Sequence, residues 1–313
     1  MNGVEETKKK SLLDRWAWAV LAAIFANVLW GSASACIKLG YRAFSIGSDA
    51  VMSQILFAGT RFFFAGVLAL LFGSIAQRRP LLPRRESAGM LVILALTQTV
   101  VQYTFFYMGL SKAPGYKGPI ISASSVFFVI LLSTLAFRQE KLSWRKLLGC
   151  LLGFAGVLVI NLQSGGGHSF RLGGEGFLLL SALSYAFSTV LLKRFTQRED
   201  PVTLCGWQFV LGGLVMMLTG LSFGGRLHPS GAGAWLLLGY LAFLSAAAYS
   251  IWSLLLRRYP PSRIAVFTFA NPVFGVFLSA WILGESAELN LTRCLLALVL
   301  VGLGIWIVNR RAD

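Results

Sequence analysis

Residues 123–140 read ASSVFFVILLSTLAFRQE, and residues 270–285 read ANPVFGVFLSAWILGE. Both stretches begin with small polar residues, continue as an apolar helix and end in a glutamate. Each is followed by a second apolar segment that ends in an asparagine, at Asn161 and at Asn309. Equivalent positions lie roughly 147 residues apart, close to half the chain length. Matching segments in the same order indicate an internal duplication.

The composition is typical of a membrane protein. Of the 313 residues, 56% are hydrophobic and 13% are charged, whereas soluble globular chains carry about 25% charged residues. The chain has too few charges to cover a water-exposed surface, and the same composition excludes a disordered, collagen-like or disulfide-stapled chain. The cysteines all lie in apolar stretches and are expected to be small buried side chains: Cys36, Cys150, Cys205 and Cys294.

Charged residues divide the chain into ten predominantly apolar runs. A membrane-spanning helix needs roughly 20 apolar residues, and each run reaches or approaches that length. The alternating pattern of membrane β-strands is not seen, so helices are predicted. The runs are 16–37, 50–77, 89–111, 118–137, 147–170, 176–192, 201–225, 227–256, 264–284 and 291–309.

The placement of Lys and Arg predicts the orientation. With ten spans, 20 of these residues lie in the tails and linkers of one side and seven on the other, while Arg61 lies inside the second span. Positive charge accumulates on the cytoplasmic side, so both termini are expected in the cytoplasm. The net charge of +16 then reflects topology and attraction to the lipid bilayer, and nucleic acid is not expected as a partner.

The predicted fold is an all-α integral membrane protein of ten transmembrane helices in the cytoplasmic (cell) membrane. A basic tail (1–15) precedes a first five-helix repeat (16–162) and a second (173–309). The sequence SASAC at 32–36 resembles a signal-peptide or lipoprotein cleavage site. Cleavage there would leave nine spans and spoil the alternation of charge, so we expect the segment to be retained.

Five spans in each half have a topological consequence. Because five is odd, the second half must enter the membrane from the opposite side, which makes the halves an inverted repeat. The start of each half also matches, with Leu29-Trp30-Gly31 against Ser184-Tyr185-Ala186. Inverted repeats are typical of secondary transporters, with a substrate site near the midplane between the halves. Duplication that only builds a stable bundle is the alternative.

The sequence resembles the EamA-type branch of the drug/metabolite transporter superfamily, over roughly residues 16–310. The segments that carry this resemblance are 271–274 and 283–285, Leu29-Trp30-Gly31, Arg61-Phe62, and Tyr103 with Phe106-Tyr107 and Gly109-Leu110. Ser125 stands where that family often has proline, and Arg138-Gln139-Glu140 replaces the first-half Leu-Gly-Glu. The resemblance implies export or facilitated passage of small metabolites, including amino acids.

The distribution of acidic residues narrows the substrate class. All twelve lie in tails, loops or span ends, and both histidines lie in loops. A proton-coupled exporter of cationic drugs needs a buried carboxylate, so a facilitator or exchanger of neutral, zwitterionic or anionic solutes fits better. Two alternatives stay open: a sugar-phosphate or nucleotide-sugar exchanger, and a lipid scramblase or membrane enzyme. No catalytic residue, cofactor or metal is expected, and a homodimer through the glycine-bearing spans 5 and 10 stays open.

Polar and aromatic residues within spans are expected to line the substrate route, because such groups face the bundle interior. Arg61 is interpreted either as the counter-charge of a substrate carboxylate or as a structural clamp on backbone carbonyls. Pro272 and Ser125 are predicted hinge positions. The predicted substrate-binding residues are Trp30, Arg61, Gln98, Gln102, Tyr103, Tyr107, Ser122, Ser124, Tyr185, Gln208, Tyr249, Trp252 and Asn271.

Overall fold

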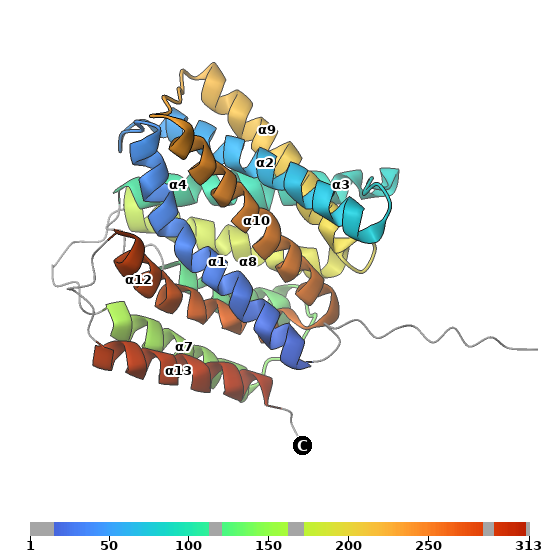
Figure 1. The fold of residues 1–313 in the computed structure, drawn as a ribbon. Helices are drawn as coiled ribbons and strands as arrows, with labels where there is room; N and C mark the ends of the chain where they lie inside the picture. The colour runs from blue at the N-terminus through green and yellow to red at the C-terminus, as the bar shows by residue number, and fades with distance from the viewer. Residues whose placement is uncertain (1–15, 113–120, 162–171, 284–290, 311–313) are drawn as a thin grey trace, which may run out of the picture.

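The computed structural model describes residues 16–112, 121–161, 172–283 and 291–310, and every regular element among them is helical (Figure 1). Each of the ten apolar runs coincides with one helix or with consecutive helical segments. The single helices are α1 (Trp16–Ala43), α2 (Val51–Gln77), α7 (Trp144–Asn161), α9 (Pro201–Ser222), α10 (Ala232–Arg258) and α13 (Leu291–Asn309).

Four of the runs form helices with a change of helical type along their length. The third combines η2 (Arg85–Ser87), α3 (Ala88–Leu94), the π-helical η3 (Ala95–Val101) and α4 (Gln102–Lys112). The fourth covers Ile121–Ala136, with α6 (Ser125–Leu131) and the π-helical η4 (Leu132–Ala136). The sixth joins η5 (Leu172–Gly176) to α8 (Phe177–Phe195), and the ninth joins α11 (Pro261–Ala265), η6 (Val266–Phe269) and α12 (Ala270–Leu283).

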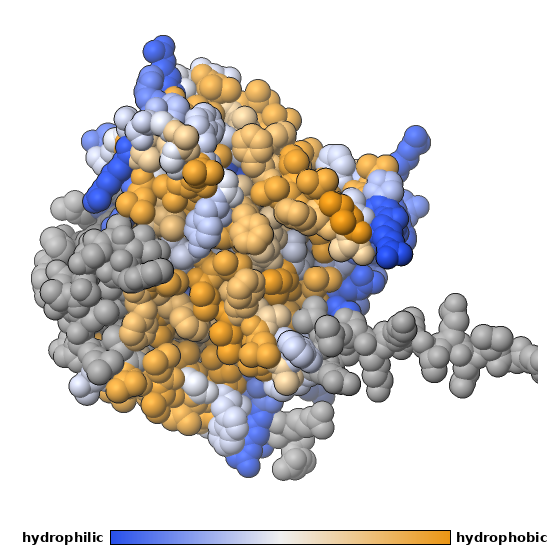
Figure 2. All heavy atoms as spheres, viewed as in Figure 1, coloured by the Kyte–Doolittle hydropathy of each residue, from blue (hydrophilic) through white to orange (hydrophobic). Residues whose placement is uncertain are grey.

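Several of these helices have the length and hydropathy of membrane spans. In the described residues six qualify, at Trp16–Ala43, Val51–Gln77, Arg85–Lys112, Leu172–Phe195, Pro201–Ser222 and Ala232–Arg258, with shorter apolar helices at Ile121–Ala136 and Leu295–Asn309. Figure 2 shows apolar side chains across the middle of one face and hydrophilic residues toward its edges. The helical class is confirmed. That ten helices cross the membrane with both termini in the cytoplasm stays a prediction.

Glycines bring α2 and α9 into close contact. A Cβ atom added to Gly59 would lie 2.9 Å from the Gly213 carbonyl oxygen, and one added to Gly213 would lie 2.8 Å from the Gly59 carbonyl oxygen. About two turns away along both helices, Gly66 and Gly206 approach each other in the same reciprocal way. Small residues allow this backbone contact between helices in a membrane, where apolar burial alone does not drive association.

Helices α7 and α13 pair in the same manner. A Cβ on Gly149 would lie 2.7 Å from the Gly304 carbonyl oxygen, and the converse distance is 2.6 Å. Gly153 and Gly156 also pack against the same chain, whereas Gly302 has no atom within 4 Å of an added Cβ. The glycines of these spans are thus used mainly for packing within the chain. The homodimer stays a prediction.

The two ends of the described chain lie at the same end of the bundle, which we name the chain-end face. The Trp16 ring packs against Tyr259, with centroids 5.2 Å apart, and Arg263 lies over the same ring at 4.4 Å. Arg263 Nε in turn donates to Asn309 Oδ1 at 3.0 Å. These contacts bring together the start of α1, the end of α10, α11 and the end of α13.

Candidate functional site

A central cavity lies between helices of both halves and encloses about 800 Å³ of space free of protein atoms, counting the part that opens to solvent. The structure places ten of the predicted residues in its lining: Trp30, Arg61, Gln102, Tyr103, Ser122, Ser125, Tyr185, Tyr249, Asn271 and Pro272. The remaining lining residues were not predicted from the sequence; they are Ala33, Ser34, Ile37, Phe106, Ala123, Ser181, Ala182 and Thr268.

Residues that are equivalent in the two halves meet at this cavity. Tyr103 and Tyr249 share a hydrogen bond between their hydroxyls, and Phe209 packs on Tyr249 with ring centroids 5.0 Å apart. Trp30 and Tyr185 are in edge-to-face contact with centroids 6.5 Å apart. The cavity therefore lies where the two halves meet.

Aromatic side chains form one wall of the cavity. The Trp30 indole contacts Tyr249 at 5.1 Å and Trp252 at 5.0 Å between centroids. Trp252 is fully buried behind Trp30 and is absent from the lining, so it supports the wall and does not face the cavity. Edge-to-face packing of this kind stabilises ring orientation by about 0.5–1.5 kcal/mol per pair.

Arg61 is buried, with 2% of its surface exposed, and it lines the cavity. Its Nη1 donates to Tyr107 Oη at 2.9 Å, and its Nη2 donates to Ser245 Oγ at 2.8 Å. Its Nε donates to Ser245 Oγ at 3.1 Å and to the Leu241 carbonyl oxygen at 3.2 Å. The predicted clamp on backbone is therefore present in part, and Tyr107, which lies outside the lining, serves to hold Arg61.

Ser245 was not predicted as a partner of Arg61. It lies one helical turn before Tyr249 on α10, and its hydroxyl donates to the Leu241 carbonyl oxygen at 3.0 Å while accepting from Arg61. A polar residue four positions from a predicted cavity residue on the same helix shares its face, and that spacing was the available signal.

Three further predicted residues lie outside the cavity lining. Gln98 and Gln208 are fully buried, and both polar atoms of each amide have no hydrogen-bond partner among the described residues. Ser124 donates to the Ile121 carbonyl oxygen within its own helix. Gln98 and Gln102 were expected on one face, but Gln98, within the π-helical η3, lies outside the lining, whereas Gln102, at the start of α4, lies in it.

The predicted hinge residues lie at breaks in their helices. Pro272 follows the 3₁₀ segment η6 in the middle of the ninth run, where a proline removes a backbone donor. In the fourth run the helix is interrupted at Ser124, whose carbonyl oxygen accepts from Phe127 N at 3.0 Å. Both breaks border the cavity through Ser125 and Pro272. That these breaks act as hinges stays a prediction.

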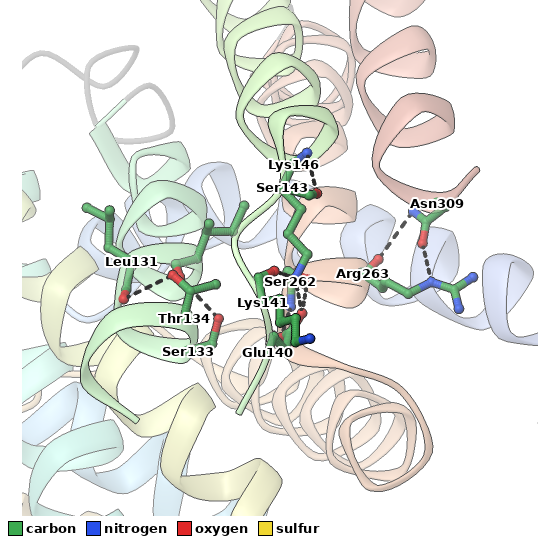
Figure 3. A network of polar contacts seen from close by, with 11 residues as sticks. Leu131, Ser133, Thr134, Glu140, Lys141, Ser143, Lys146, Ser262, Arg263 and Asn309 are labelled. Carbon is green, nitrogen blue, oxygen red and sulfur yellow. Dashed lines mark hydrogen bonds and ion pairs between the residues drawn. The ribbon is translucent and has the colours of Figure 1, made fainter. Parts of the chain in front are cut away.

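At the chain-end face, Glu140 joins the two halves (Figure 3). Its Oε1 accepts from Ser262 N at 3.0 Å, its Oε2 accepts from the Ser262 hydroxyl, and Lys146 Nζ lies 2.6 Å from Oε2. Lys146 also donates to the Lys141 carbonyl oxygen at 2.8 Å. The glutamate that ends the first repeated motif therefore holds the start of α11 in the second half.

A second carboxylate, Glu199, ties the loop before α9 to the start of the third run. It accepts from Ser87 Oγ at 2.6 Å, from Asp200 N at 3.0 Å and from Arg84 N at 3.2 Å. Burial raises the pKa of this carboxyl, but these hydrogen bonds and the Arg84 charge outweigh burial, so its pKa is lower than usual.

Comparison with known proteins identifies the family. A profile described as the EamA-like transporter family matches residues 17–162 and 172–310, one match in each half. The chain belongs to this family. The EamA-like chain is a multi-pass membrane protein of a transporter family, as its apolar helices and relatives indicate.

Individual relatives extend over nearly the whole EamA-like chain. It is 28% identical to "Uncharacterized transporter sll0355" of Synechocystis, covering 93% of this chain and 89% of the relative. It is 29% identical to "Uncharacterized inner membrane transporter YedA" of Escherichia coli, covering 91% of each. A "Probable amino-acid metabolite efflux pump" of Salmonella typhimurium is 28% identical over 84% of this chain and 86% of its own.

A solved crystal structure has the same fold. It superposes with a TM-score of 0.71 at 20% sequence identity, over 94% of this chain and 96% of its own. At that identity the match supports the helical arrangement alone.

Proposed function

We propose that the protein is a secondary transporter that moves small polar metabolites, amino acids or similar solutes, across the cytoplasmic membrane by alternating access. In this proposal ten helices cross the membrane as two inverted repeats, and both termini lie in the cytoplasm. The route is the central cavity, and the protein works as an exporter or facilitator.

One observation carries the proposal: symmetry-equivalent residues, Tyr103 with Tyr249 and Trp30 with Tyr185, meet at the cavity. If two similar halves can exchange conformations, a site on their common axis is exposed first to one side and then to the other, without moving. The name of the Salmonella relative, which mentions amino-acid metabolites, supports the substrate range.

Counterflow into proteoliposomes tests the proposal. Purified protein is reconstituted, and the uptake of labelled L-amino acids and small neutral metabolites is measured into vesicles loaded with the same unlabelled solute. We expect saturable uptake of at least one solute above protein-free vesicles. No uptake of any solute on the panel would contradict the proposed substrate range.

Matched tryptophan substitutions test the route. Ala182 lines the cavity, whereas the next residue of α8, Leu183, is 41% exposed on the outer surface. Ala182→Trp is expected to abolish uptake, and Leu183→Trp is expected to retain it. Ser34→Trp, at a half-buried lining position, provides a second obstruction if Ala182→Trp does not fold, as judged by size-exclusion chromatography.

A further inference from the structure

Arg61 is a buried cation whose described surroundings are electrically neutral. Its partners are a tyrosine hydroxyl, a serine hydroxyl and a backbone carbonyl, and its guanidinium carbon lies 4.9 Å from the Phe62 ring centroid. No carboxylate of the described residues lies within ion-pair distance of it. Neutral dipoles reduce the desolvation penalty of a charge, but they leave the net charge in place.

Some N–H groups of the guanidinium have no hydrogen-bond partner among the described residues. Of its five N–H groups, the hydrogen bonds above engage the Nε group and one group on each terminal nitrogen. One N–H on Nη1 and one on Nη2 therefore remain without a partner among the described residues. Both groups lie in the guanidinium plane and can donate to carboxylate oxygens, and Arg61 borders the cavity.

Other lining groups complete a site for a small organic anion. Trp30 Nε1, a donor, and Gln102 Oε1, an acceptor, are buried without a partner among the described residues. The lining residues include no Asp, Glu or His, so within the described lining no second charge offsets Arg61. Aromatic rings beside these polar groups suit the carbon skeleton of an amphipathic solute.

We propose that the central cavity binds a small organic carboxylate, with its carboxylate held by the free N–H groups of Arg61. This inference rests on the transport function proposed above and narrows its solutes to those that carry a net negative charge. The occupied site is electrically neutral, and the empty site carries one positive charge. Each cycle that carries a monoanion one way and returns empty therefore moves one negative charge across the membrane.

The direction of net transport follows from that charge. A membrane potential that is negative on the cytoplasmic side drives an anion outward, and a tenfold outward distribution corresponds to about 60 mV. The same potential favours the state in which the positive empty site is open to the cytoplasm. Internal solute binds in that state. An uncoupled carrier of this kind acts as an exporter without a proton or sodium gradient.

The binding experiment uses probes that differ in charge but hardly in shape: N-acetyl-L-phenylalanine, an anion at neutral pH, and its neutral amide. Affinities are measured for the purified protein in nanodiscs. We expect the anion to bind at least tenfold more tightly, and Arg61→Met to remove that difference while Arg85→Met, an exposed control, retains it. Equal affinities in the unaltered protein, including no measurable binding of either probe, would overturn the inference.

A measurement on the unaltered protein does not depend on how the variants fold. Proteoliposomes are loaded with labelled N-acetyl-L-phenylalanine, and a potassium gradient with valinomycin sets the potential. Efflux is expected to accelerate when the interior is negative and to slow when it is positive. Efflux that is independent of potential would overturn the charge-carrying cycle.

The two proposals fail in different ways. Binding of the anion without transport of any solute would leave the carboxylate site in place and refute the transporter. Counterflow of amino acids, without preference for the anion over its amide and without an effect of Arg61→Met, would leave the transporter in place and refute the carboxylate site.

Discussion

Arg61 and Glu140 are both largely buried charged residues, but among the described residues only Glu140 has a partner of opposite charge. Glu140, with 8% of its side chain exposed, accepts hydrogen bonds from a lysine ammonium, a backbone N–H and a serine hydroxyl. Arg61, with 2% of its surface exposed, donates only to neutral acceptors among the described residues. A charge whose partners are all supplied by the chain holds the fold together, whereas a charge that lacks a counter-ion is available to a ligand.

The positions of the two charges agree with this difference. Glu140 is at the chain-end face, where it joins the end of the fourth run to the start of α11 (Figure 3). Arg61 is near the middle of α2, at the cavity between the halves. Four substitutions, taken from the largest expected effect to the smallest, test the comparison through the free energy of unfolding in mixed detergent and SDS micelles.

Glu140→Ala should have the largest effect. It leaves the Lys146 ammonium without its carboxylate and removes two acceptors from the start of α11. Breaking a buried ion pair destabilises strongly, and because this pair is slightly exposed we expect a loss of about 3 kcal/mol. The exposed Glu86→Ala serves as the control. A loss no greater than that of the control would mean that Glu140 does not hold the two halves together.

Ser245→Ala should have the next largest effect. It removes the acceptor that serves both Nε and Nη2 of Arg61, and a hydrogen bond to a charged group contributes about 2 kcal/mol. In an Arg61→Met background the same substitution should cost almost nothing, since no cation is left to stabilise. Equal losses in the two backgrounds would show that Ser245 acts by packing and not by holding Arg61.

Arg61→Met should have the opposite sign. It replaces a buried charge, for which the described residues offer no counter-ion, with an apolar side chain of similar length, and we expect a gain of about 1–2 kcal/mol in the ligand-free protein. The free energy of unfolding in the same micelles without solute checks this, with Arg85→Met as the exposed control. A loss of stability comparable to that of Glu140→Ala would mean that Arg61 is a structural clamp, and the comparison would fail.

Glu199→Gln should have the smallest effect, about 1 kcal/mol at neutral pH, because the amide replaces only part of the hydrogen bonding. The pKa of this carboxyl is lower in the folded protein than its usual value, which is about 4.3 in unfolded chains. Its stabilising effect is therefore complete above that pH and is lost as the pH falls through the lower folded value. The difference between the variant and the unaltered protein should shrink below about pH 4. A difference that grows on acidification would contradict the lowered pKa.

Much of the architecture could be predicted from the amino-acid sequence. The spacing of charged residues separates ten apolar runs, and each coincides with helical structure in the described part of the chain. The prediction of helices succeeds because a backbone surrounded by lipid must form its hydrogen bonds internally. For a continuous apolar run, the helix is the regular structure that does so. The match between halves paired Tyr103 with Tyr249 and Trp30 with Tyr185, residues that meet at the cavity.

The details of the cavity depended on the tertiary structure. Gln98 and Gln208 have the polarity of cavity residues but lie outside the lining, whereas Ser34 and Ala182 line it with no distinguishing chemistry. Polarity within a span indicates that a residue faces the bundle interior, but it does not indicate which interior space the residue faces. The i, i+4 spacing of Gln98 and Gln102 predicts a shared face, yet only Gln102 reaches the cavity.

Helical class, the order of the runs and the duplication are thus properties of the sequence alone, because they follow from local hydropathy and spacing. The surroundings of Arg61 were decided by the fold, since Ser245 and Leu241 lie more than half the chain away from it in sequence. An arginine within a span is equally consistent with a paired and an unpaired charge. Only the packing of α2 against α10 determines that the acceptors it meets are neutral, and so leaves its charge for a ligand to balance.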